Sequence, residues 1–98
     1  MRLTQNEVTL IKKAFYETFQ SGKIFLFGSR VDDTKRGGDI DLYIELPYKL
    51  DIKRELEKKS QFRLKLYDLI GEQKIDIIIS KDKNRSIEKE IIKTGIIL

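Results

Sequence analysis

The stretch from residue 39 to residue 46 alternates strictly between two kinds of side chain, and it constrains the fold most. Apolar residues take one parity, and the other parity carries Asp39, Asp41, Tyr43 and Glu45. Because successive side chains of a β-strand point to opposite faces, this pattern predicts a strand with one apolar face. Asp39 and Asp41 would project side by side, roughly 7 Å apart along the strand. Folding alone gives no reason for this repulsion, whereas a divalent cation, which prefers oxygen ligands, would compensate it.

Composition limits the classes of site that the chain can build. Its 98 residues are enough for one small domain with a modest core. The absence of cysteine and histidine excludes thiolate zinc sites, cysteine nucleophiles and Ser-His-Asp triads. Lys and Arg outnumber Asp and Glu by 20 to 16, a mild excess that suits an anionic ligand such as a nucleotide. Without an apolar signal segment or a membrane-length apolar run, we expect a cytoplasmic protein with no membrane contact.

Periodicity along the rest of the chain predicts alternating helices and strands. Thr4 and Glu7 have capping-box spacing at the start of an amphipathic pattern, and Gly22 offers that helix a stop. Residues 58–61 interrupt an apolar stripe that Ile52 begins, so this region is either two helices or one long helix. In order, we expect a helix over 4–21, strands over 23–27 and 39–46, helical structure over 51–70, a strand over 74–79, a helix from Ser86 to Gly95 and a small edge strand in 96–98.

The order of these elements limits their arrangement. A helical crossover between the strands 39–46 and 74–79 implies that the two are parallel, through a right-handed connection. The strand 23–27 would pair with 39–46 in the antiparallel sense. The apolar parity of 39–46 must pack on helices, while the acidic parity must face water or a ligand, with Tyr43 at the wall of a cleft and Glu45 at the surface. We therefore expect an α+β fold with a small mixed sheet of three to four strands flanked by helices.

Polar residues from three distant segments converge in this arrangement. Parallel strands begin at the same end of a sheet, so Asp39 and Asp41 would meet Asp76, an acid that looks buried among isoleucines. The alternative for Asp76 is a plain exposed acid on an edge strand. The first strand would end at the same place and bring Gly28 and Ser29 toward the acids.

Three carboxylates at one end of a sheet form a binding site for one or two Mg²⁺ ions. Two-metal sites clamp the attacking and leaving oxygens of an in-line phosphoryl displacement. Asp39 and Asp41 would bridge the metals, and Asp76 would hold the metal that activates the nucleophile or accept its proton. Gly28 would let a phosphate approach the backbone, and Ser29 would begin a helical turn whose N–H groups face the phosphate, or serve only as a cap.

The loop over residues 30–38 carries charges of both signs. Three basic side chains could neutralise phosphate charge that Mg²⁺ does not, although each taken singly is more typical of a solvated loop: Arg30, Lys35 and Arg36. Two acids oppose them: Asp32 and Asp33.

The chain resembles the DNA polymerase β-type nucleotidyltransferase superfamily. The resemblance lies in Gly28-Ser29, nine further residues, Asp39-Ile40-Asp41 in an alternating strand, and Asp76 on a later strand. The small size is similar to that of the minimal nucleotidyltransferases, the antitoxin half of HEPN–minimal nucleotidyltransferase toxin–antitoxin pairs. The resemblance implies a palm-like core and a single nucleotidyltransferase domain over residues 1–98. It also implies that the three acids are catalytic Mg²⁺ ligands and that the nucleotide is bound by Gly28 and Ser29, with Arg30 beside them.

The same resemblance implies a reaction and a partner. Antitoxin members transfer AMP from ATP to a tyrosine of the cognate HEPN ribonuclease, so we expect transfer of AMP from ATP to a hydroxyl of a HEPN-type toxin protein. That partner, or a second copy of this chain, would complete the substrate pocket. Many minimal members carry a basic residue and a glycine where this chain has Asp32-Asp33, which motivates an alternative: a non-catalytic antitoxin that neutralises its partner by binding. A nucleic-acid partner would rest only on the net charge of +4, and we do not expect one.

Overall fold

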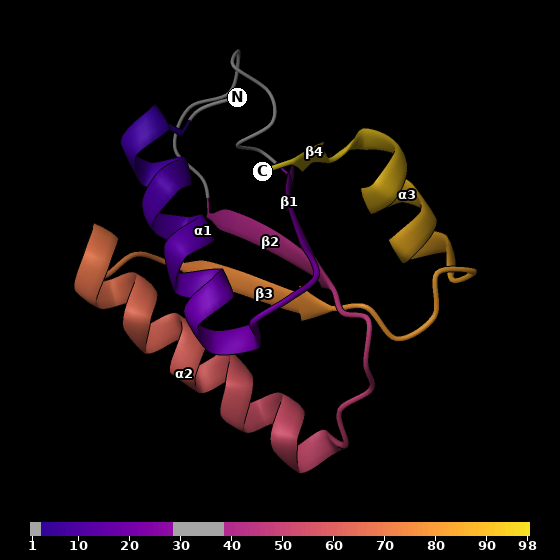
Figure 1. Ribbon diagram of the computed structural model, residues 1–98. Coiled ribbons are helices and arrows are strands. Elements are labelled where there is room, and N and C mark those ends of the chain that lie inside the picture. Colours follow the sequence, from indigo (N-terminus) through magenta and orange to yellow (C-terminus); the bar gives the residue numbers. More distant parts are fainter. Residues whose placement is uncertain (1–2, 29–38) are drawn as a thin grey trace.

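A computed structural model describes residues 3–28 and 39–98, and Figure 1 shows how their elements are arranged. The described residues form an α+β fold, as predicted. In chain order the elements are α1 (Gln5–Phe19), β1 (Lys23–Phe27), β2 (Ile40–Glu45), α2 (Ile52–Ile70), β3 (Ile75–Ile79), α3 (Ser86–Thr94) and β4 (Ile96–Ile97).

The strands form one mixed sheet in the order β3-β2-β1-β4. β1 and β2 are antiparallel, β2 and β3 are parallel, and the short β4 pairs with β1 in the antiparallel sense. This confirms the crossover argument, because the helix α2 connects the two parallel strands. It also confirms the edge strand in the apolar tail.

The apolar parity of β2 faces the main core. Its three members are completely or almost completely buried, at exposures of 0–1%: Ile40, Leu42 and Ile44. They pack in one cluster with aromatic and aliphatic side chains of α1 and α2, among them Phe15, Phe19, Phe62 and Leu66. Burial of such side chains removes large apolar areas from water and is the main force that holds the two helices on the sheet. Helices α1 and α2 therefore cover this face side by side (Figure 1).

The opposite face of the sheet is covered by α3, which changes the expectation for two residues of the acidic parity. Tyr43 is completely buried, and its hydroxyl donates a hydrogen bond of 2.8 Å to Glu88 of α3. Glu45 pairs with Lys83 at 3.6 Å, and its side chain is only 14% exposed. The prediction that this parity faces water or a ligand is wrong for Tyr43, and Glu45 is largely covered rather than a surface residue.

Three helix predictions need comment. The capping box of Thr4 and Glu7 is present, but α1 ends at Phe19 with Gln20 in the left-handed conformation, so Gly22 is not its stop. Gly22 instead lies at a φ of +120° against the carbonyl of Glu45, where a Cβ would collide with that backbone. The region over 51–70 is one helix.

The apolar stripe of α2 starts later than its sequence suggests. Ile52 and Leu56 are 75% and 59% exposed although Glu55 between them is buried, so these two side chains lie on the outer side of the helix, whereas Phe62 and Leu66 are completely buried. The Lys58 ammonium donates a hydrogen bond of 3.0 Å to the carbonyl of Thr18, so the polar interruption joins α2 to α1. Among the described residues, no helix is long and apolar enough to cross a membrane.

Candidate metal centre

Three carboxylates meet where β2 and β3 begin. Asp39 directly precedes β2, Asp41 is its second residue, and Asp76 is the second residue of β3. Asp41 and Asp76 are partners in the parallel register, and Asp39 lies two residues from Asp41 on the same face. Each of the three residues offers a carboxylate oxygen, and these oxygens all lie within 4.8 Å of one another. The convergence expected from topology is therefore present.

Asp76 is exposed, although its isoleucine neighbours made it look buried. The reason is the position of β3 at the edge of the sheet, next to β2 only. Asp39 and Asp41 are half-buried. Asp76 is thus an exposed acid on an edge strand, and it also lies close to the other two acids. The exposure leaves the cluster accessible from solvent on the side of β3.

The carboxylates perturb one another. Burial, the charge of Asp76, hydrogen bonding to Asp76 and the charge of Asp39 raise the pKa of Asp41 to about 6, against the opposing charge of Lys74. A raised pKa means that the cluster holds its full negative charge at a cost in free energy. A divalent cation would remove that cost, and oxygen donors so arranged suit Mg²⁺. The three residues therefore fit a metal ion.

Gly28 has a geometric role that the sequence did not reveal. It follows β1 with a φ of +76°, and a Cβ built on it would collide with the carboxylate of Asp41. Only glycine accommodates both the positive φ and the close acid. The other nucleotide-binding residues predicted from the sequence, Ser29 and Arg30, lie outside the described residues, as do the loop charges at positions 32–36.

Lys74 is a residue of this site that was not predicted from the sequence. Its Nζ lies 3.5 Å from Oδ2 of Asp39, and its side chain is 77% exposed. A signal was present, because Lys74 shares the parity of Asp76 at the start of the predicted strand, so both side chains belong to one face.

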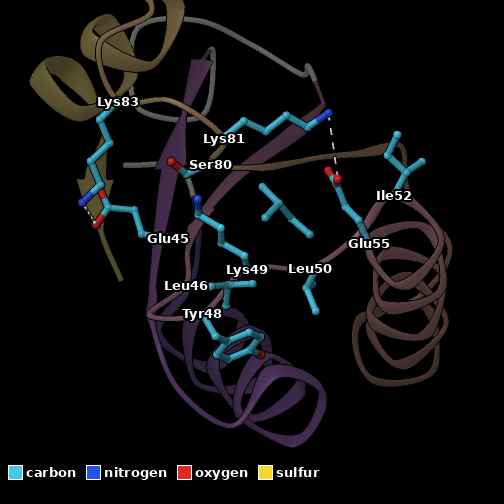
Figure 2. A pocket seen from close by; sticks show the side chains of 11 residues that line it. Glu45, Leu46, Tyr48, Lys49, Leu50, Ile52, Glu55, Ser80, Lys81 and Lys83 are labelled. Atoms are coloured by element: carbon cyan, nitrogen blue, oxygen red, sulfur yellow. Dashed lines mark ion pairs between the residues drawn. The ribbon is translucent and has the colours of Figure 1, made fainter.

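A cavity of about 570 Å³ lies at the other end of β2 and β3, around Leu46, Leu50 and Ile79 (Figure 2). It contains none of the three acids. Its two glutamates are paired with lysines, Glu45 with Lys83 at 3.6 Å and Glu55 with Lys81 at 3.9 Å. The three acids thus lie away from this cavity, at the opposite end of the strands.

The polymerase β nucleotidyltransferase family matches residues 9–98, which include all four strands and the three acids. The chain belongs to this family. Comparison with curated proteins found no match. Together with the carboxylate cluster, the family shows that the chain is a nucleotidyltransferase domain whose three aspartates could hold a metal ion.

Proposed function

We propose that this nucleotidyltransferase domain transfers AMP from ATP, with Mg²⁺, to a hydroxyl of a HEPN-type toxin protein and so acts as an antitoxin. The observation that carries the proposal is the convergence of Asp39, Asp41 and Asp76 within 4.8 Å beside a glycine that follows β1. The specific reaction and partner are supported by the resemblance of the motif and of the element order to the minimal nucleotidyltransferases.

The roles of the residues follow from their positions. Asp39, Asp41 and Asp76 would hold Mg²⁺, which supplies positive charge for the phosphoryl oxygens of the nucleotide. The acceptor hydroxyl forms a bond to the α-phosphorus, the bond to pyrophosphate breaks, and the hydroxyl proton passes to a carboxylate. Asp76 is suited to accept that proton, since it is exposed at the sheet edge where an acceptor can approach. Gly28, with Ser29 and Arg30 after it, would contact the nucleotide phosphates.

The test is a label-transfer assay. The protein is incubated with ATP labelled at the α-phosphate, Mg²⁺ and the product of the adjacent gene. We expect label on that product, a loss of at least about a hundredfold with Asp39→Asn or Asp41→Asn, and no loss with the exposed helix variant Asp68→Asn. Equal transfer by Asp39→Asn and wild type, or no transfer by either, contradicts the enzymatic proposal.

A second candidate is an antitoxin that neutralises its partner by binding alone. The acidic pair Asp32-Asp33, at positions where many minimal members carry a basic residue and a glycine, favours it. In that case Asp39→Asn and Asp41→Asn would still protect cells that express the partner. Under the first proposal both variants lose protection, so one growth assay separates the two candidates.

A further inference from the structure

Lys74 lies at the edge of the carboxylate cluster, and the roles assigned above do not use it. It directly precedes β3, and its carbonyl accepts a hydrogen bond of 3.1 Å from the N–H of Ile40. That bond places the backbone of Lys74 beside the first residue of β2. The long side chain is therefore attached at a defined point next to Asp39, while most of it is exposed to solvent.

The charge of Lys74 acts on more than one acid. Its ammonium lies 3.5 Å from the carboxylate of Asp39, and carboxylate oxygens of Asp39, Asp41 and Asp76 all lie within 4.8 Å of one another. Among residues 3–28 and 39–98, the contact with Asp39 is the one ion pair that any of the three acids makes. Lys74 thus supplies part of the positive charge that the three acids need in the absence of a cation.

This ion pair is suited to exchange. Its lysine side chain is 77% exposed and its aspartate side chain 34% exposed, and ion pairs in contact with water are weak. A divalent cation among the carboxylates would repel the ammonium at this short distance. The ammonium would leave Asp39 but stay near the site, because its backbone is held by Ile40. A nucleotide bound to the metal would bring phosphate oxygens to the same place.

We propose that Lys74 exchanges partners during substrate binding: it pairs with Asp39 in the metal-free protein and with the nucleotide triphosphate once the metal is bound. The inference rests on the proposed function, since it needs a metal–nucleotide complex at the three acids. It assigns Lys74 as a phosphate-binding residue that also sets the metal affinity of the empty site.

The experiment uses two charge-removing variants. Lys74→Met keeps most of the length of the side chain and removes its charge. Lys81→Met is the matched control, because Lys81 follows the opposite end of β3, is 61% exposed and pairs with Glu55 at 3.9 Å. Calorimetry measures the binding of Mn²⁺ alone, and then of a non-hydrolysable ATP analogue in the presence of Mg²⁺. Thermal melts of each variant confirm that it folds.

The two measurements should change in opposite directions. Lys74→Met should bind Mn²⁺ about two- to fivefold more tightly, since the metal no longer displaces an ammonium. It should bind the ATP analogue about tenfold more weakly, since a charged contact to phosphate is lost. Lys74→Arg should restore nucleotide binding, and Lys81→Met should match the wild type in both measurements.

The outcomes separate this inference from the proposed function. Unchanged nucleotide affinity in Lys74→Met overturns the exchange, even if Mn²⁺ binds more tightly, and weaker Mn²⁺ binding overturns it as well. If Asp41→Asn abolishes Mn²⁺ binding while Lys74→Met behaves as wild type, the inference alone fails. If the wild type binds no Mn²⁺, both the inference and the proposed function fail.

Discussion

A single glycine, Gly28, links the end of β1 to the geometry of the acids. Its φ of +76° belongs to the left-handed region, and the position of its missing Cβ is taken by the carboxylate of Asp41. Gly71, after α2, has a similar φ of +88° but nothing within 4 Å of the corresponding position. The two glycines therefore separate the effect of backbone strain from the effect of displacing an acid.

Replacement of these glycines by alanine should have different consequences for metal binding. Gly71→Ala should lower the free energy of unfolding by about 1–3 kcal/mol through strain alone, because Gly71 has a φ of 88° and a ψ of 165°, a conformation that is essentially restricted to glycine. Gly28→Ala should lower it further and weaken Mn²⁺ binding about tenfold, because Asp41 must move. Chemical denaturation and calorimetry measure the two quantities. Equal Mn²⁺ affinity in Gly28→Ala and wild type would contradict the account of Gly28.

At the scale of elements, α3 is fastened to the sheet by one buried carboxylate. Glu88 is 2% exposed. It accepts hydrogen bonds from two hydroxyls and two backbone N–H groups, at 2.6 Å from Ser80, 2.8 Å from Tyr43, 2.9 Å from Asp82 and 3.2 Å from Lys81. Burial raises the pKa of Glu88, but these hydrogen bonds outweigh it, and the pKa lies below its usual value. The ionised form of Glu88 thus stabilises the fold.

Glu88→Gln should destabilise the protein in a pH-dependent way. A carboxyl whose pKa is lower in the folded state contributes stability above its unfolded value of 4.5 and loses it as the pH falls through the folded value. We expect a loss of about 2 kcal/mol near neutral pH, and a difference from wild type that shrinks as the pH falls below 4.5. Denaturant unfolding at several pH values measures the free energy of unfolding of the variant and of the wild type. The exposed Glu90→Gln is the control, and an equal loss there would refute the anchoring role.

At the scale of the whole molecule, the site works against stability. The pKa of Asp41 is raised from 3.8 in the unfolded chain to about 6 in the folded protein. The stability that protonated Asp41 contributes is therefore complete below pH 3.8 and is lost as the pH rises through about 6. Near neutral pH the metal-free protein therefore carries the repulsion among the three acids. A bound cation or the loss of one charge should relieve it.

Asp41→Asn should accordingly stabilise the metal-free protein. Without screening, the pKa difference corresponds to about 3 kcal/mol in the free energy of unfolding. Because the carboxylate is partly exposed, screening by solvent reduces this to about 1 kcal/mol. We expect a rise of roughly 4–8 °C in Tm when metal is chelated. Added Mg²⁺ should raise the Tm of the wild type and not of the variant. Asp68→Asn, on α2, should have the same Tm as the wild type, both when metal is chelated and when Mg²⁺ is added.

The sequence by itself determined the order of helices and strands and the parity of the acids, but not where the first helix ends or whether residues 51–70 form one helix or two. The alternation around Asp39 and Asp41 and the capping pair Thr4 and Glu7 depend on neighbours along the chain, so their effects can be predicted from the sequence. The parallel pairing that a helical crossover implies then sufficed to bring Asp76 to the other two acids. The chemistry of the cluster followed from residue type and topology.

Only the tertiary structure decided how these elements are covered and which charges meet. It buried Tyr43 under α3, exposed Ile52 on α2, and placed Asp76 on an open edge. It also brought Lys74 against Asp39. Each of these outcomes depends on contacts between residues far apart in the sequence, where packing of whole elements outweighs local pattern. The alternating stretch therefore predicted that Asp39 and Asp41 share one face of a strand. Only the fold showed that the Lys74 ammonium lies beside Asp39 and that Gly28 leaves room for the carboxylate of Asp41.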